Sequence, residues 1–365
     1  PRPHQLAAVA RVIAEPSVGL WHEVGAGKTA EMAMAAMELR RLGLAGKPAI
    51  VVPNHMLRQF TTEFLELYPR AKLLAASTED LTADKRRRFI GKITTGDWDA
   101  VIITRGAFER IRMSPAAQQQ YLSREMAMLD DALSRAAASD DRLAVKRLEK
   151  MRIRAEERLK QAMASVKDRG ITFELTGIDY LFVDEAHGYK NLRTPANTPS
   201  MNVDGSNRAT DLHMKIEYLR GRRSRVVTFA SATPIANTMG EAYTMLRFLR
   251  PDLLDVLGIG DFDTFAATFA DTVTEIEVAP EGGIRFATRF AKFINVPELL
   301  RPWHIAGDVK TAEDLQLDVP QLAPRPEDGQ RLPETVVVAP SEELTVYVQQ
   351  LADRAAAAMR QAAAE

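Results

Sequence analysis

The stretch Gly19–Thr29, GLWHEVGAGKT, joins a short apolar run to a glycine-rich turn, and the helix-forming run AEMAMAAMELRRL follows at once. Glycine accepts backbone angles that are closed to other residues, so Gly25 and Gly27 let successive N–H groups point inward as a nest for an anion. The N-terminal end of the following helix adds positive charge. The stretch therefore predicts a strand, a phosphate-binding loop and a helix. The nucleotide-binding residues expected in the loop are Gly25, Ala26, Gly27, Lys28 and Thr29.

In phosphate loops of this kind, the lysine reaches the β- and γ-phosphates and the hydroxyl that follows it binds Mg²⁺. We therefore predict that Lys28 contacts the phosphates of ATP and that Thr29 is a ligand of Mg²⁺. The strict form of the pattern has a glycine six residues before the lysine, where this chain has His22. A glycine-rich turn that binds nothing is the alternative interpretation, and the motifs downstream decide between the two.

Composition narrows the class of protein. The chain has 365 residues, which favours about two domains, and its formal net charge of -1 gives no global attraction to nucleic acid. It has no cysteine, so disulfides and thiolate metal sites are excluded. No run has the length of a membrane span and no signal-peptide pattern opens the chain. We expect a cytoplasmic protein without a membrane partner and, because the chain opens at Pro1 rather than Met, a fragment of a longer protein.

Further apolar runs suit strands buried on both faces, at 49–52, 99–104, 180–183 and 226–230. The run at 180–183 ends in two acids, Asp184 and Glu185, which are costly at the end of a buried strand unless they act. Ligands of open α/β sheets bind at that edge. We predict that Asp184 holds Mg²⁺, directly or through water, and that Glu185 polarises the attacking water. Acids that merely cap the next turn are the alternative.

Several polar residues beside these motifs are candidates for supporting roles. The predicted catalytic set is Lys28, Asp184 and Glu185. His187 can hydrogen-bond across to another motif. Ser231 and Thr233 follow the strand at 226–230 and can relay the nucleotide state, although hydroxyls at such a position also cap helices. Gln5 stands upstream of the phosphate loop, where its amide either reads the adenine edge or faces solvent.

Residues 114–169 differ from the rest of the chain. Leu122, Met126, Leu129 and Leu133 repeat at helical spacing, ASDD at 138–141 interrupts the pattern, and a second helical pattern follows. This predicts an antiparallel helical hairpin with a coiled-coil-like seam. Its second arm, residues 142–169, holds ten Lys or Arg and four acids. That arm and the second basic cluster, RGRRSR at 220–225, either face nucleic acid or are solvated surfaces.

The order of motifs resembles that of superfamily 2 helicases and translocases. These motifs are RPHQ, GAGKT, AIVVP, VIIT with Arg105, VDEAH and SATP. The loop HEVGAGKT fits the relaxed phosphate loop of that superfamily. The detailed sequence of several segments is most similar to that of Swi/Snf-type DNA translocases, and it also resembles the helicase parts of large bacterial mobile-element proteins. The segments that carry it are DEAH with Lys190-Asn191 close behind, TPIAN leading to Glu241, FLRP at 248–251, and ETVVVAPSEELTVYVQQL from 334.

The resemblance implies an α/β fold: a RecA-like lobe with a mostly parallel sheet flanked by helices, plus the inserted helical hairpin. It assigns adenine to Gln5, phosphates and Mg²⁺ to the loop, metal and water to Asp184 and Glu185, and coupling to Ser231 and Thr233. The expected organisation is lobe 1, first part (1–112), the hairpin (113–170), lobe 1, second part (171–255), an extension and linker with a β-hairpin (256–333), and the start of a truncated second lobe opening with a strand at 334–339 (334–365).

The function expected from the resemblance is an ATP-driven translocase or helicase motor on DNA, most simply duplex DNA. The catalytic partner would be a second RecA-like lobe, whose arginine has no candidate in this chain, so we expect the fragment to be weakly active or inactive alone. Two other classes stay open. One is a non-catalytic nucleotide switch or scaffold subunit of a defence or mobile-element system, and the other is an RNA helicase.

Overall fold

In the computed structural model of the chain, the residues described are 1–138, 142–164, 172–196, 205–236, 238–278, 284–316, 322–326, 328–333 and 336–364. Their contacts divide the chain into two units. The first comprises residues 1–271 and 293–315, and the second comprises 272–292 and 316–365. The expected glycine turn at 280–283 lies outside the described residues.

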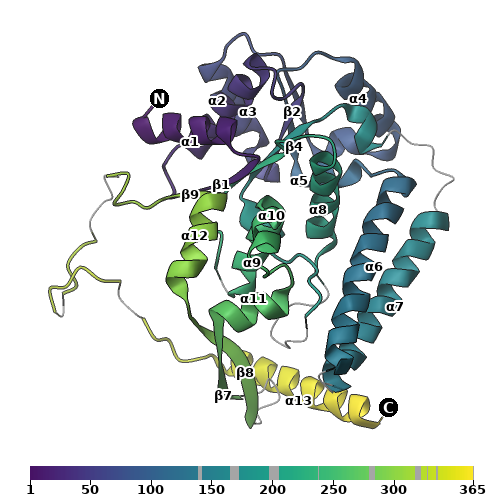
Figure 1. The fold of residues 1–365 in the computed structure, drawn as a ribbon. Helices are drawn as coiled ribbons and strands as arrows, with labels where there is room; N and C mark the ends of the chain where they lie inside the picture. The colour runs from purple at the N-terminus through teal and green to yellow at the C-terminus, as the bar shows by residue number, and fades with distance from the viewer. Residues whose placement is uncertain are drawn as a thin grey trace. The chain divides into compact units, whose positions relative to one another are not determined.

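The first unit is built on a seven-stranded sheet in the order β3-β4-β2-β5-β6-β1-β9, in which every neighbouring pair is parallel (Figure 1). The predicted α/β, RecA-like fold is confirmed by this sheet. Its strands are β1 (Ser17–His22), β2 (Pro48–Val52), β3 (Leu73–Ala76), β4 (Ala100–Thr104), β5 (Tyr180–Asp184), β6 (Val227–Ala230) and β9 (Gly307–Lys310).

Helices cover both faces of the sheet. Alternate strand residues, such as Val18 and Leu20 or Ile50 and Val52, pack into one core with helices α1, α2 and α3, as the two-residue period of a strand requires. On the other face, α9 brings Phe248 against Phe229 of β6, with ring centroids 5.3 Å apart. The helices of the first unit are α1 (Pro3–Ala14), α2 (Lys28–Arg41), α3 (Leu57–Leu67), α4 (Ala83–Thr95), α5 (Arg105–Arg110), α6 (Pro115–Ala138), α7 (Arg142–Ala164), α8 (Asn207–Arg220), α9 (Gly240–Leu249), α10 (Pro251–Val256), α11 (Phe262–Phe269) and α12 (Val296–Ala306).

The two helices expected between 113 and 170 are present as α6 and α7, which lie side by side (Figure 1). Their seam is apolar and buried, and its members are Leu129, Ala132, Ala136, Leu148, Met151 and Ala155. The first helix is tied to the lobe by buried polar contacts. Tyr121 Oη lies 2.8 Å from His213 Nδ1 on α8, and Arg247 on α9 donates to Glu125 across 2.8 Å. The base of the hairpin is therefore part of the core of the first unit.

Strand β9 is a feature that the sequence did not predict. Residues 307–310 form the edge of the sheet and pair with β1, with Gly19 opposite Gly307 and His22 opposite Lys310. The preceding helix α12 stacks Trp303 on Trp21 of β1, with ring centroids 5.6 Å apart. Residues 293–315, which lie within the segment expected to be an extension and linker, thus belong to the first unit.

The second unit contains most of the paired strands β7 (Ala270–Val278) and β8 (Ile284–Phe293), together with helix α13 (Glu342–Ala364). The strand expected at 334–339 is wrong over 336–339, its described part, which is not in a strand. Val336, Val337 and Val338 are 73%, 89% and 79% exposed, because no described strand pairs with them. Among the helices that the structure describes, none is both long enough and apolar enough to cross a membrane.

Candidate active site

The predicted motifs meet at the carboxyl edge of three adjacent strands. Strand β6 lies between β1 and β5, and its last residue, Ala230, is opposite both Leu20 of β1 and Asp184 of β5. Because parallel strands end at the same edge, the loops after all three converge there. The Ser231 backbone N–H donates to the Leu20 carbonyl across 3.1 Å, which fixes the exit of β6 beside that of β1.

The loop after β1 has the backbone expected of an anion nest. Gly25 and Gly27 have φ of 85° and 87°, in the left-handed region that favours glycine. Helix α2 begins at Lys28, directly after Gly27. The Lys28 ammonium donates to the carbonyls of His22 and Glu23, across 2.9 and 3.1 Å. Lys28 therefore spans the mouth of the loop, and Thr29 lies in the first turn of the helix.

Gln5 lies against the loop itself. Its amide donates to the Ala26 carbonyl across 3.3 Å and accepts from the Arg2 backbone N–H across 2.8 Å. A Cβ added to Gly27 would lie 2.4 Å from Gln5 Nε2, so the contact needs glycine at that position. The structure thus brings Gln5 to the phosphate loop, and its reading of adenine stays a prediction.

Asp184 is the last residue of β5 and is 7% exposed. Burial, together with the neighbouring charge of Glu185, raises the pKa of Asp184 to about 6, against the lowering effect of the Glu185 backbone N–H and of the Arg105 and Lys28 charges. A buried carboxylate with a raised pKa is one that gains from a nearby cation. Asp184 therefore fits the predicted role of a Mg²⁺ ligand.

Glu185, His187 and Ser231 form a small network across the two strand exits. The His187 ring nitrogen Nδ1 lies 3.0 Å from Glu185 Oε2 and 3.1 Å from Ser231 Oγ. The Thr233 backbone N–H donates to Ser231 Oγ across 3.1 Å. The structure thus places His187 beside Ser231 of the SAT motif, while the coupling role of these residues remains a prediction.

Sequence reasoning missed a buried charged cluster behind the loop. His22, which stands at the first glycine of the strict pattern, is fully buried and places Nδ1 2.9 Å from Glu31 of α2 and Nε2 3.1 Å from Asp308 of β9. Burial alone would lower the pKa of His22, but the hydrogen bonds to Asp308 and Glu31 outweigh it and the pKa is raised. With a carboxylate facing each ring nitrogen, His22 is suited to be the doubly protonated donor. The signal for this cluster in the sequence was Glu31, an acid in the first turn of the helix that follows the loop.

The residues at this edge fit Mg·ATP. The positive-φ glycines form a cradle for phosphate, and Asp184 is a buried carboxylate. The Lys28 ammonium donates hydrogen bonds to loop carbonyls, and a bound phosphate would replace them as its acceptor. Within the described ranges no group of three or more acids or histidines could hold a metal by itself. Mg²⁺ in such sites is held by one or two carboxylates, a hydroxyl and the phosphates, so Thr29 and Asp184 would be its protein ligands.

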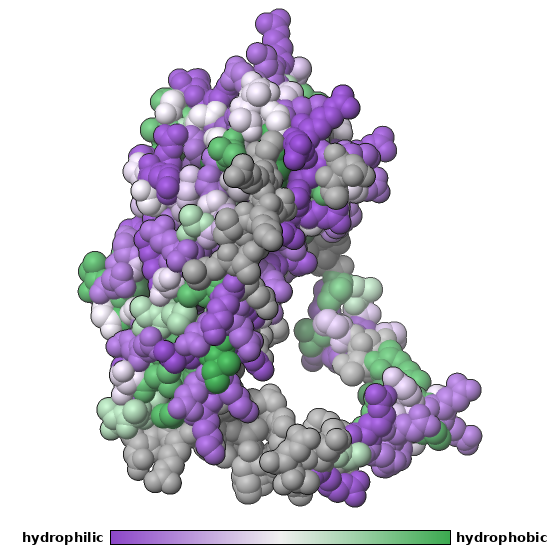
Figure 2. Space-filling view, turned by 90° about the vertical axis from the view of Figure 1, so that its right-hand side faces the viewer, coloured by the Kyte–Doolittle hydropathy of each residue, from purple (hydrophilic) through white to green (hydrophobic). Residues whose placement is uncertain are grey.

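The two basic regions, residues 220–225 and helix α7, differ in whether their charged side chains form contacts within the lobe. Arg220 donates to the Phe248 carbonyl across 2.6 Å, Arg225 to the Ile13 carbonyl across 2.7 Å, and Arg223 pairs with Asp179 at 2.9 Å. These arginines stabilise the lobe itself. Three lysines of α7 are exposed instead, and Figure 2, which presents this side of the chain, shows mainly hydrophilic side chains with separate apolar patches. The exposed lysines are Lys146, Lys150 and Lys160.

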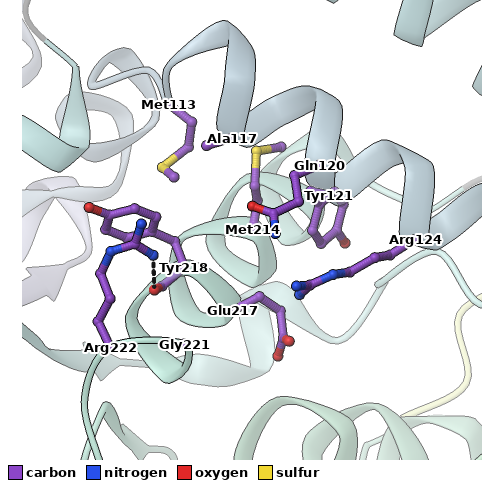
Figure 3. A pocket seen from close by; sticks show the side chains of 10 residues that line it. All are labelled: Met113, Ala117, Gln120, Tyr121, Arg124, Met214, Glu217, Tyr218, Gly221 and Arg222. Atoms are coloured by element: carbon purple, nitrogen blue, oxygen red, sulfur yellow. Dashed lines mark hydrogen bonds between the residues drawn. The ribbon is translucent and has the colours of Figure 1, made fainter.

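A pocket of about 210 Å³ lies where α6 meets α8 (Figure 3). Arg124 enters it from α6, and Arg222, just beyond the end of α8, enters it from the opposite side. The Arg222 guanidinium lies 3.8 Å from the centroid of the Tyr218 ring. This combination of a cation with an aromatic face is compatible with nucleic acid, although Glu217 also lines the pocket.

Comparison with known proteins gives the family. Among solved structures, the chain is similar to the Sulfolobus solfataricus SWI2/SNF2 ATPase core in complex with dsDNA, at 16% identity and a TM-score of 0.40, over 73% of this chain and 38% of that one. The chain thus spans 38% of the length of that protein. No match was found among curated proteins. A family model described as "Probable helicase domain" matches residues 15–311, most of the chain. The chain therefore belongs to this family of helicase domains.

Proposed function

We propose that the chain is the ATP-binding lobe of a motor that hydrolyses ATP to translocate on duplex DNA. The observation that carries the proposal is the meeting of the phosphate loop, Asp184-Glu185 and Ser231 at one edge of the sheet. This arrangement provides a phosphate cradle, a carboxylate for a metal and a second carboxylate for water. Membership of the helicase-domain family supports the same function.

The roles follow from position. The loop binds the phosphates and Lys28 supplies a positive charge to them, while Thr29 and Asp184 would hold Mg²⁺, whose charge offsets that of the transferring phosphoryl group. Glu185, whose side chain is partly exposed and lies 3.0 Å from His187 Nδ1, orients and polarises water. Ser231 bonds to His187 and to Thr233, so it can transmit the state of the site to the exit of β6.

A slow rate is expected from this chain by itself. An arginine supplied by a partner domain is worth roughly 10³–10⁵ in the rate of phosphoryl transfer. We propose that a second RecA-like lobe supplies it, so this chain binds Mg·ATP and hydrolyses it slowly. Single-turnover hydrolysis of radiolabelled ATP, compared between this chain and a longer one, measures the difference, and a fast, DNA-stimulated rate in this chain alone would refute the claim.

The Glu185→Gln substitution tests the catalytic proposal. It keeps the size of the side chain and removes the base, so the hydrolysis rate should fall by about 10²-fold or more while nucleotide affinity stays within a factor of about three. Glu79 is an exposed acid that follows β3, a strand that β4 and β2 separate from β5, and it provides the matched control Glu79→Gln. An unchanged rate in Glu185→Gln would favour a non-catalytic nucleotide switch or scaffold.

The DNA proposal is tested through the exposed lysines of α7. Reversing Lys146, Lys150 and Lys160 to Glu should weaken binding to duplex DNA and flatten the dependence of log K on log salt, because fewer counterions are released. Reversal of the exposed Lys92 on α4 is the control for net charge. An unchanged slope would mean that these lysines face solvent and do not contact DNA. Stronger stimulation of ATPase by structured RNA than by duplex DNA would instead favour an RNA helicase.

A further inference from the structure

Arg105 reaches the catalytic strand from another part of the sheet. It is the first residue of α5, directly after β4, and β2 lies between β4 and β5. One guanidinium nitrogen, Nη2, donates to the Asp184 carbonyl across 2.9 Å and to the Glu185 carbonyl across 2.6 Å. These two carbonyls belong to the peptide groups on either side of the Glu185 Cα. A single nitrogen therefore fixes both peptide planes that define φ and ψ of Glu185.

The backbone at Glu185 needs such support. Its φ of 50° and ψ of 49° place it in the left-handed region, and it is one of three non-glycine residues there within the described part of the chain. Residues with a Cβ rarely adopt this conformation, and it persists only where surrounding contacts enforce it. Strain of this kind collects at active sites, where it aims a side chain. Here it carries the Glu185 carboxylate to within 3.0 Å of His187.

The surroundings of Arg105 are shaped to hold it in this position. A Cβ added to Gly188 would lie 2.8 Å from Arg105 Nη1, so any larger residue in the turn after Glu185 would have to displace the guanidinium. The Tyr189 ring lies 5.7 Å from the guanidinium carbon. Arg105 Nε is buried and has no hydrogen-bond partner. A buried N–H without a partner costs free energy. We take this to mean that the hydrogen bonds to the two carbonyls set the position of the Arg105 side chain.

We propose that Arg105 is a positioning residue for ATP hydrolysis, which clamps the two peptide groups around Glu185 and so aims its carboxylate. The inference rests on the proposed function, because the aimed group is the predicted water-polarising acid. Arg105 acts through the backbone of Glu185 and contributes no proton. Its removal should therefore lower the catalytic rate and leave nucleotide binding almost unchanged.

Arg105→Ala, Arg105→Lys and Arg110→Ala form a matched set. Arg110 lies on the same helix and donates to the Thr78 and Leu81 carbonyls, away from the site, so Arg110→Ala controls for the loss of an arginine–carbonyl contact. We expect the single-turnover rate of Arg105→Ala to fall by about 10²-fold, the effect of a misplaced catalytic group, with KM for ATP within about threefold. Arg105→Lys keeps a donor and should recover about tenfold of the loss. A rate of Arg105→Ala equal to that of Arg110→Ala would overturn the proposal.

Two further readouts separate this inference from the proposed function. If Arg105 acts through Glu185, Arg105→Ala should change the rate less than about threefold in a Glu185→Gln background, because the two changes disable one element. Additive losses would overturn the inference while leaving the ATPase intact. A crystal structure of Arg105→Ala reports φ of Glu185 directly, whatever the activity. Departure from the left-handed region supports the clamp, and an unchanged φ refutes it.

Discussion

The buried pair of Arg247 and Glu125 should hold the helical hairpin to the motor lobe. The two side chains are 7% and 10% exposed, and Arg247 Nη2 donates to Glu125 Oε1 across 2.8 Å, joining α9 to α6. The other guanidinium nitrogen, Nη1, donates to the Arg193 carbonyl, also across 2.8 Å. Replacing Arg247 with Met keeps most of the volume and leaves the Glu125 carboxylate buried without its cation.

The magnitude follows from that burial. Removing one partner of a buried ion pair costs about 3–5 kcal/mol, since the remaining charge is uncompensated. Domains of this kind are stable by about 5–15 kcal/mol, so Arg247→Met should remove a large part of the total. The double variant Arg247→Met/Glu125→Leu removes both charges. Replacing a buried pair by apolar residues is often neutral or stabilising, so most of the loss should be recovered in the double variant.

Urea unfolding followed by circular dichroism measures the free energies, and hydrogen exchange of α6 amides locates the loss. The control is Arg208→Met, which breaks a half-exposed pair with Glu109 and should cost at most about 1 kcal/mol. A loss below about 1 kcal/mol in Arg247→Met, or a double variant as unstable as the single one, would refute the reasoning. The hairpin would then be held by its apolar contacts and by the Tyr121–His213 hydrogen bond.

Burial and the charge of Arg247 hold the pKa of His213 well below 6.5, so the unfolded chain binds more protons and stability should fall as pH drops below 6.5, by up to about 1.4 kcal/mol per unit. His213→Phe should flatten that slope in urea unfolding between pH 7.5 and 5.0, and an equal slope would contradict the assignment. Gly27→Ala, at a φ of 87° with Gln5 Nε2 in the way, should weaken binding of a fluorescent ATP analogue at least about tenfold. Gly43→Ala, at a φ of 70° with open space, is the matched control and should bind normally.

The inner strands of the sheet were predictable because each is a continuous apolar run. Residues 49–52 and 180–183 are buried on both faces, and only a run without polar alternation can be placed there. The acids that follow such a run stand out, so Asp184 and Glu185 could be placed at the edge from sequence alone. Their approach to Ser231 required the strand order, which puts β6 beside β5.

The contacts that Arg105 makes with a distant strand were not predictable. The clamp from Arg105 depends on a side chain that crosses from β4 to β5, and no local pattern records that distance. The run at 334–339 led to a wrong prediction because the local pattern of a strand was present without a neighbouring strand to pair with it. Its β-branched residues have the propensity of a strand, but a strand exists only where a neighbour pairs with it, and residues 336–339 have none among the described strands.

The missing glycine of the phosphate loop and the unexpected edge strand have one explanation. His22 is opposite Lys310 in the pairing of β1 with β9, and its imidazole lies between Glu31 and Asp308. The Glu23 backbone N–H donates to the Lys310 carbonyl across 2.9 Å, so β9 also fixes the first residue of the loop. A glycine at position 22 could make neither side-chain contact, and the Glu31 and Asp308 carboxylates would both lose their imidazole partner. Strand β9 therefore explains why His22 replaces the glycine of the strict pattern, because Asp308 on β9 needs a hydrogen-bonding partner on β1.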